Sequence, residues 1–164
     1  MNHLTVRPAT IADLPRILEI YDIARKFMWA NGNPTQWPAN HPAAGLLEAD
    51  IAAGQLFAAV DGNTIHGVFA FILGDDPTYT IIEQGCWRST APYGTIHRIA
   101  SDGTGGILAT ALAYAETKAN HLRIDTHEDN KPMQHLVEKY GFSKRGIIYT
   151  GNGSPRLAYD RLEE

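Results

Sequence analysis

The pattern of hydrophobic and polar positions predicts strands along most of the chain. Alternating or continuous apolar runs cover residues 4–7, 55–60, 64–73, 79–83, 95–101, 121–127, 147–150 and 156–159. Two of these runs flank Asp61-Gly62-Asn63, which is typical of a hairpin turn, and the last two flank Asn152-Gly153. Neighbouring strands are therefore expected to pair mostly in the antiparallel direction.

Four other segments repeat their apolar residues at helical spacing. The first begins at Thr10, with Asp13 three residues later in a capping-box pattern, and ends near residue 31. The second covers residues 43–53, and the third begins at Ile107. The fourth follows Asn130 and ends at Gly141. This order predicts an α/β fold with a mixed, mostly antiparallel central sheet flanked by helices, in a single domain over residues 1–164.

A glycine cluster joins one predicted strand directly to a predicted helix. The strand 95–101 runs into Asp102-Gly103-Thr104-Gly105-Gly106, and the helix begins at once. Such a junction directs several backbone N–H groups and the positive end of a helix dipole at one point. Glycines also let an anion approach the backbone, so the cluster predicts a phosphate or pyrophosphate site. The alternative interpretation is a tight strand-to-helix turn without a ligand.

Composition and charge argue against several classes of partner. The 164 residues carry a formal net charge of −4 without a run of lysine or arginine, which argues against nucleic acid. No apolar run reaches the roughly 18 residues of a membrane span, and the first ten residues lack the features of a signal peptide. The single cysteine, Cys86, cannot form an internal disulfide and is expected to be buried in a strand. A reducing, cytoplasmic location is therefore predicted, and a homodimer is one assembly compatible with the sequence.

Three stretches resemble the GNAT superfamily of N-acetyltransferases, and the likeness covers nearly the whole chain. VRPATIADLPRILEIY resembles the family's first strand and helix, and the strand–glycine–helix segment resembles its acetyl-CoA pyrophosphate loop. THEDNKPMQHLVEKYGF resembles the motif in which a strand is followed by an asparagine and a helix ending in Gly-Phe. The resemblance implies acetyl-CoA as co-substrate, in a cleft where the fourth and fifth strands splay apart. The cofactor-binding residues implied are Ile99, Ala100, Ser101, Gly103, Thr104, Gly105, Gly106, Ile107 and Asn130, the last of which can equally cap a helix.

Two features depart from the family's pattern. The loop usually reads Gln/Arg-x-x-Gly-x-Gly/Ala, and here the glycines fit either as Gly103-x-Gly105 or as Gly106-x-Leu108. Asp102 also adds a carboxylate beside the expected phosphate, where it would repel an anion. Family members often place a tyrosine five residues before the Phe of Gly-Phe, to protonate the departing thiolate. Val137 occupies that place, and the position of Tyr140 on the apolar stripe indicates core packing.

Acetyl transfer from a thioester to an amine needs proximity, a donor for the oxyanion and a route for the amine's proton. The resemblance assigns the donor to the backbone N–H of Ile99 or its neighbour. His97 is the first candidate base, because it stands where a catalytic histidine precedes the same strand positions in the serotonin acetyltransferase branch. Asp125 and His127 share one face of a later strand and are the rivals. A structural role is the alternative for each, and no HxH or HExxH spacing supports a metal site.

The resemblance also implies where the acceptor would bind. Trp29, Gln36 and Trp37 lie in or just before the loop between the first two helices, which forms the acceptor wall in this family. Glu83 is a further candidate because its carboxylate attracts a cationic amine, whereas the Asp75-Asp76 pair is better explained as a solvated turn.

The predicted function is transfer of an acetyl group from acetyl-CoA to the primary amine of a small molecule or peptide, by direct attack in a ternary complex. One alternative is a non-catalytic acyl-CoA-binding module, which the missing tyrosine favours. The other is a dinucleotide-binding domain, in which Gly103-x-Gly105-x-x-Leu108 would be a fingerprint without its third glycine.

Overall fold

The computed structural model describes residues 3–163, which form one seven-stranded sheet of order β1-β2-β3-β4-β5-β7-β6. Every neighbouring pair of strands in this part of the chain is antiparallel except β4 and β5. The expected mixed, mostly antiparallel sheet is confirmed. The strands are β1 (Thr5–Pro8), β2 (Leu56–Asp61), β3 (Thr64–Leu73), β4 (Gly94–Ser101), β5 (His121–Thr126), β6 (Ser143–Tyr149) and β7 (Pro155–Leu162).

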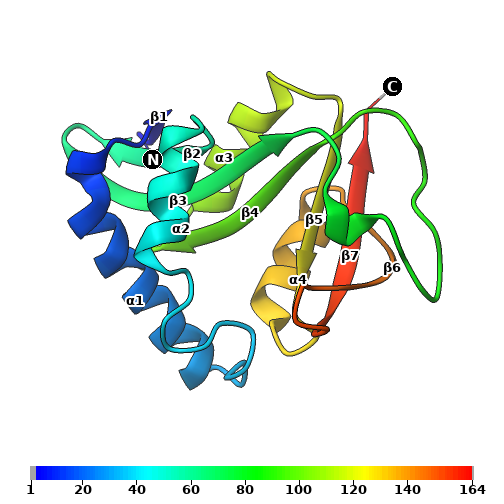
Figure 1. The fold of residues 1–164 in the computed structure, drawn as a ribbon. Coiled ribbons are helices and arrows are strands. Elements are labelled where there is room, and N and C mark those ends of the chain that lie inside the picture. The colour runs from blue at the N-terminus through cyan, green and yellow to red at the C-terminus, as the bar shows by residue number, and fades with distance from the viewer. Residues whose placement is uncertain (1–2, 164) are drawn as a thin grey trace.

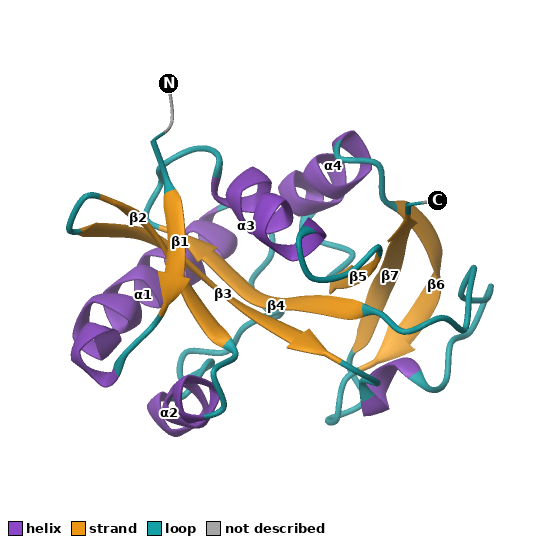
Figure 2. Ribbon diagram, turned by 90° about the horizontal axis from the view of Figure 1, so that it is seen from above, coloured by secondary structure: helices purple, strands orange, loops and turns teal. Residues whose placement is uncertain are grey.

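Helices cover both faces of the sheet (Figures 1 and 2). Helices α1 and α2 lie against one face of the half that contains β1 to β4, and α3 and α4 lie against the opposite face. None of the helices in residues 3–163 is long and apolar enough to cross a membrane. The helices are α1 (Leu14–Ala30), α2 (Ala44–Ala52), α3 (Ile107–Glu116) and α4 (Lys131–Lys139), with short 3-10 turns η1 (Ile11–Asp13) and η2 (Pro77–Tyr79).

The two-residue repeat of a strand divides the core into two layers. Ala58 on β2 and Val68 on β3 are buried in the cluster beneath α1 and α2. Their neighbours Phe57 and Phe69 are buried in the cluster beneath α3 and α4. Because successive side chains of a strand point to opposite faces, both layers take apolar residues from the same strands. These strands therefore appear in the sequence as continuous apolar runs.

Strands β4 and β5 pair only where they begin. Gly94 pairs with Leu122 and Thr95 with Arg123, and no further pair of described residues joins the two strands. Strand β5 instead stays paired with β7 as far as Thr126. The two halves of the sheet consequently diverge after residue 95, as the expected splayed strands require (Figure 2).

Residues 79–83 do not form the predicted strand. Asp76 starts the 3-10 turn η2, because its side chain accepts a 2.8 Å hydrogen bond from the backbone N–H of Thr78. Beyond this turn the segment makes a single isolated bridge, between Glu83 and Ile147. Cys86 lies in the same irregular stretch and is exposed, so its expected burial in a strand is wrong. The aromatic residue that favoured a strand, at position 79, is buried by side-chain packing rather than by strand pairing.

Candidate active site

Strand β4 carries a bulge where it leaves β5. Val68 on β3 pairs with Ala100, and Ala70 on β3 pairs with His97. Two residues of β4, Arg98 and Ile99, therefore lie opposite the single β3 residue at position 69. Arg98 has a φ of +52°, in the left-handed region. That conformation costs about 1–2 kcal/mol for a residue with a Cβ, so the surroundings must enforce it. Bulges of this kind turn the backbone out of the ladder and are common beside active sites.

Helices α1 and α2 hold the bulge in place from one side of the sheet. The hydroxyl of Tyr21 on α1 donates to the carbonyl oxygen of Arg98 over 2.6 Å. The Arg98 guanidinium binds Oδ2 of Asp50 on α2, at 2.8 Å from Nη2 and 3.0 Å from Nε. Tyr21 and Asp50 are both buried, and burial raises the pKa of Tyr21, so its hydroxyl keeps the proton that it donates.

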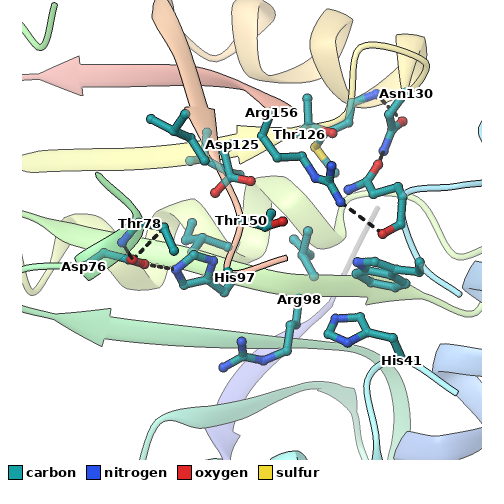
Figure 3. Close-up of a pocket in the computed structure, with 18 of the residues that line it drawn as sticks. His41, Asp76, Thr78, His97, Arg98, Asp125, Thr126, Asn130, Thr150 and Arg156 are labelled. Atoms are coloured by element: carbon teal, nitrogen blue, oxygen red, sulfur yellow. Dashed lines mark hydrogen bonds and ion pairs between the residues drawn. The ribbon is translucent and has the colours of Figure 1, made fainter. Parts of the chain in front are cut away.

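A cavity of about 540 Å³ opens beside this bulge, between the diverging strands (Figure 3). Its volume lies in the range of about 300–1,000 Å³ that is usual for small-molecule sites. The walls come from β4, β5, the loop after α1, turn η2 and the β6–β7 hairpin. Its polar and charged lining residues are Gln36, His41, Asp76, Thr78, His97, Arg98, Asp125, Thr126, Asn130, Thr150, Asn152 and Arg156.

His97 and Asp76 form a hydrogen-bonded pair in the wall of this cavity. Nε2 of His97 lies 2.6 Å from Oδ2 of Asp76, and Oδ1 of Asp76 accepts from the hydroxyl and backbone N–H of Thr78. Burial by itself raises the pKa of Asp76, but the hydrogen bonds from His97 and Thr78 lower it to about 2. Asp76 is therefore a carboxylate at neutral pH and not the solvated turn residue that the sequence suggested.

The Asp76 carboxylate also determines which nitrogen of His97 can act as a base. An ionised carboxylate only accepts hydrogen bonds, so Nε2 is the donor and Nδ1 carries the lone pair of the neutral ring. Nδ1 has no hydrogen-bond partner within residues 3–163. The pair thus has the arrangement of a base that is oriented by a carboxylate.

Asp125 lies across the cavity from this pair, on β5 (Figure 3). Its Oδ2 accepts a 2.6 Å hydrogen bond from the hydroxyl of Tyr79. Burial raises the pKa of Tyr79 well above its ordinary value, and the neighbouring Asp125 charge adds to that effect. Within residues 3–163 no cation is in direct contact with the Asp125 carboxylate, although its charge interacts with that of Arg156, so a cationic ligand can still contact it.

A second cavity, of about 210 Å³, lies at the glycine cluster. Ile99 and Met133 line both cavities, so the two adjoin at the bulge. The residues around the smaller cavity are Ile99, Ala100, Ser101, Thr104, Gly105, Gly106, Ile107, Leu108, Ala109, Met133, Leu136 and Tyr140.

The glycine cluster has the form of a phosphate cradle. A Cβ added at Gly105 would meet no atom within 4 Å, so the space in front of the backbone is open. Gly106 has a φ of +86° and leads directly into α3, whose first N–H groups lack partners within the helix. Room beside glycines and a helix N-terminus are the features that suit an anion. The residues present therefore fit the pyrophosphate of a nucleotide-like ligand.

Asp102 does not oppose such an anion, because its charge is already compensated. Its Oδ2 lies 2.8 Å from Nη2 of Arg16 on α1 and 2.8 Å from Nδ1 of His66 on β3. Burial raises the pKa of Asp102, but hydrogen bonds from Thr104 and His66 outweigh this effect and lower it. Asp102 lines neither cavity, so the expected repulsion is absent.

Most of the predicted cofactor-binding residues surround the two cavities. Ile99, Ala100, Ser101, Thr104, Gly105, Gly106 and Ile107 line the smaller cavity. Asn130 lines the larger one, where its Nδ2 donates to Oε1 of Gln36 over 3.1 Å and its Oδ1 accepts from the N–H of Met133. It therefore caps α4 and also ties that helix to the loop after α1. Gly103 lines neither cavity and shapes the turn with a φ of +107°.

The other predicted residues divide into two groups. His97, Asp125, Gln36 and Trp37 line the larger cavity, whereas Trp29, Glu83 and His127 line neither.

The residues outside the cavities have structural contacts instead. Trp29 donates its ring N–H to the backbone of Trp37, and Glu83 accepts from the hydroxyl of Tyr149. Nδ1 of His127 accepts a backbone N–H just before α4.

Sequence reasoning missed Arg156, His41 and Arg98, and it gave Asp76 a different role. Arg156 had one readable signal, because it shares the two-residue repeat of β7 with Ala158, and both are buried. No local motif marks the other residues, which reach the cavity through the loop after α1, the bulge and turn η2. Tyr140, expected in the core, packs partly against it and also lines the smaller cavity.

Comparison with known proteins places this architecture in a family. The model of the acetyltransferase (GNAT) domain matches residues 3–143. A GNAT-family acetyltransferase from Streptococcus agalactiae superposes with a TM-score of 0.86 at 27% identity, over 98% of this chain and 96% of that chain. One from Listeria monocytogenes has a TM-score of 0.71 at 19% identity, over 98% and 95%. A ribosomal-protein-alanine N-acetyltransferase from Brucella melitensis has a TM-score of 0.61 at 22% identity, over 98% and 100%.

No curated protein sequence matches the chain. The family model nevertheless spans most of the sequence, and the fold superposes on the solved GNAT-family structure from Streptococcus agalactiae. The chain therefore belongs to the GNAT family of acetyltransferases, whose members transfer an acetyl group from acetyl-CoA.

Proposed function

We propose that this protein transfers the acetyl group of acetyl-CoA to the primary amine of a small molecule or peptide, by direct attack in a ternary complex. The observation that carries the proposal is the pair of adjoining cavities that meet at Ile99 and Met133. One cavity has the glycine cradle, and the other has an oriented histidine and the carboxylate of Asp125, which the hydroxyl of Tyr79 holds. Two reactants bound in this way would meet at the bulge of β4, which supplies the proximity that the reaction needs.

The smaller cavity would hold the co-substrate. Acetyl-CoA supplies an acetyl group that is activated as a thioester. The backbone N–H groups of the Gly105–Ile107 segment would bind its pyrophosphate, with Asn130 near the other end of the cleft. The backbone N–H of Ile99, at the bulge, is the proposed donor to the oxyanion that develops on the acetyl carbonyl.

The larger cavity would hold the amine and remove its proton. Asp125 would attract the amine in its cationic form, and Gln36 and Trp37 would form the wall behind it. Nδ1 of His97 would take one proton from the cationic amine and so free the lone pair with which its nitrogen attacks the acetyl carbon. As the carbon–nitrogen bond forms and the carbon–sulfur bond breaks, the second proton of the nitrogen would pass to the departing thiolate, which leaves as coenzyme A thiol. The carboxylate of Asp76 would stabilise the imidazolium that results.

A non-catalytic acyl-CoA-binding module is the second candidate, and one observation favours it. Val137 occupies the place of the family's frequent tyrosine and is fully buried, so it offers no proton to a departing thiolate. The pair of His97 and Asp76 favours the enzyme instead, because a binding module has no need of an oriented base.

The decisive experiment measures the release of free coenzyme A thiol from acetyl-CoA in the presence of a panel of primary amines. Turnover with intersecting initial-velocity lines supports direct transfer in a ternary complex, whereas parallel lines indicate a covalent acetyl-enzyme and contradict it. Thermal stabilisation by acetyl-CoA without release for any amine would favour the binding module. Absence of stabilisation at millimolar acetyl-CoA would contradict both candidates.

A further inference from the structure

Arg156 is a buried cation that faces the larger cavity without a carboxylate partner. It lies on β7, lines the cavity and is only 8% exposed. Its Nη1 donates to the hydroxyl of Ser154 and to the carbonyl oxygen of Pro155, and its Nη2 donates to the carbonyl oxygen of Gln36 over 3.1 Å. Within residues 3–163 it forms no ion pair. Three neutral acceptors therefore orient the guanidinium, while the charge of Asp125 interacts with it through space without an ion pair.

An arginine in this state is unusual, because a buried charge is normally paired. Arg98, the other arginine of the cavity wall, follows that rule through its ion pair with Asp50. A guanidinium has five N–H donors in a planar fork, and the contacts of Arg156 account for three acceptors. Its remaining donors are thus available to a ligand in the cavity, and no described carboxylate contacts the guanidinium directly.

Both signs of charge line the cavity (Figure 3). Asp76 and His97 lie on one side and Arg156 and His41 on the other, and Asp125, which faces the first pair across the cavity, interacts electrostatically with Arg156. Burial lowers the pKa of His41, and the charges of Arg98, Arg156 and a third arginine lower it further, which agrees with a positive potential on that side. A ligand with one cationic and one anionic group would match both sides at once.

We infer that the acceptor is a free amino acid or a small zwitterion of the same kind, whose carboxylate binds Arg156 while its amine faces Asp125 and His97. A carboxylate is the planar anion that a guanidinium binds in bidentate fashion. A cavity of about 540 Å³ accommodates such a molecule with its side chain. This inference rests on the proposed function for the fate of the amine, but the carboxylate site rests on Arg156 alone.

The test measures binding rather than turnover. Calorimetry in the presence of coenzyme A, which has no acetyl group to transfer, compares each proteinogenic L-amino acid with its carboxamide and its decarboxylated amine. We expect at least one amino acid to bind about tenfold to a hundredfold more tightly than the two forms without the carboxylate. The Arg156→Gln variant should abolish this preference, and Arg156→Lys should restore part of it. Lys144→Gln removes a charge from an exposed position on the neighbouring strand and should change nothing.

Each outcome decides the inference. Equal binding of the three forms, binding of none of them, or a preference that survives in Arg156→Gln would overturn it. If Arg156→Gln does not fold, two measurements still test the inference. They are the preference of the wild-type protein for the carboxylate form and the partial retention of that preference in Arg156→Lys. The same panel in the thiol-release assay separates this inference from the proposed function. If the protein acetylates amines whether or not they carry a carboxylate, the proposed function holds and this inference is wrong. If it binds amino acids selectively but acetylates none of them, this inference holds and the proposed function is wrong.

Discussion

Tyr21 on α1 donates its hydroxyl hydrogen to the carbonyl oxygen of Arg98, 2.6 Å away at the bulge of β4. Arg98 is in a left-handed conformation, so this bond helps to maintain a backbone geometry that the residue would not adopt alone. If the bulge positions the oxyanion donor, α1 controls the chemistry of the cavity through this bond.

The first prediction tests this relationship with Tyr21→Phe. Loss of the hydroxyl leaves a carbonyl group without its donor, which should lower the free energy of unfolding by about 1–3 kcal/mol. A displaced donor should also lower kcat by about tenfold or more, because catalysis is sensitive to small misplacements. Acetyl-CoA affinity should change little, since the glycine cradle is untouched.

Tyr159→Phe is the matched control for that experiment. Tyr159 is 1% exposed, Tyr21 is fully buried, and Tyr159 lines neither cavity. Its loss of a hydroxyl should leave kcat within about twofold of the wild type, as expected for a site remote from the chemistry. A Tyr21→Phe protein with wild-type kcat would show that the bulge does not depend on this bond.

The second prediction concerns the proton route through His97. His97→Ala should lower kcat by about 10²–10⁴-fold, the usual contribution of a positioned base. Affinity for acetyl-CoA should stay nearly constant, because its proposed contacts are backbone groups. The acidic limb of the wild-type pH–rate profile should disappear in the variant.

Asp76→Asn separates the role of the carboxylate from that of the imidazole. The 2.6 Å contact between Asp76 and His97 orients the ring, so its removal should lower kcat, though less than His97→Ala does. A His97→Ala protein that folds, with wild-type turnover and an unchanged profile, would exclude His97 as the base.

The third prediction tests the glycine cradle with Gly105→Asp. The new Cβ has open space around it, so the fold should tolerate the substitution, while the carboxylate would occupy and repel the phosphate site. We expect acetyl-CoA to bind at least about tenfold more weakly, and the roughly 2.7 kcal/mol of stabilisation at 100 times the wild-type Kd to fall accordingly.

Gly45→Asp serves as its control, because a Cβ at Gly45 on α2 also meets nothing within 4 Å and the residue lines neither cavity. Equal thermal shifts for the two variants in acetyl-CoA would argue that the ligand does not bind at the glycine cluster.

The sequence predicted the fold well where local patterns coincide with burial. Continuous apolar runs marked β2 and β3 because both faces of those strands are covered. Capping residues marked the start of the first helical segment at Thr10 and of α4 at Asn130. The pattern misled at residues 79–83, where Tyr79 is buried beside Tyr93 and Ile148 rather than in a strand. The spacing of apolar residues cannot distinguish an aromatic side chain buried in a strand from one buried by the packing of a loop.

A continuous stretch of the site was predictable where its residues lie in one local unit, whereas elsewhere the sequence indicated single positions such as His97 and Asp125. The segment from Ile99 to Ile107 lies in one strand–loop–helix unit, so its place beside a cavity followed from the local pattern. His97 and Asp76 are 21 residues apart, and Arg156 reaches Gln36 across 120 residues. Such contacts depend on how the loops after α1 and β3 fold over the sheet, which no spacing in the sequence encodes.

The fourth prediction follows from the pKa of Asp76, which the hydrogen bonds from His97 and Thr78 lower to about 2 against the effect of burial. The pKa of an aspartate in an unfolded chain is about 3.9. At pH values between the native and the unfolded pKa, the unfolded chain therefore binds more protons than the native protein. The stability that this group contributes is therefore complete above about pH 4 and is lost as the pH falls through about 2.

The free energies of unfolding in urea of the wild type and of Asp76→Asn should differ by about 1–2 kcal/mol at pH 5, and the difference should shrink towards pH 2. The similarly lowered pKa of Asp13 is common to both proteins and cancels. A difference that does not change over this range would mean that Asp76 is not held as a hydrogen-bonded carboxylate.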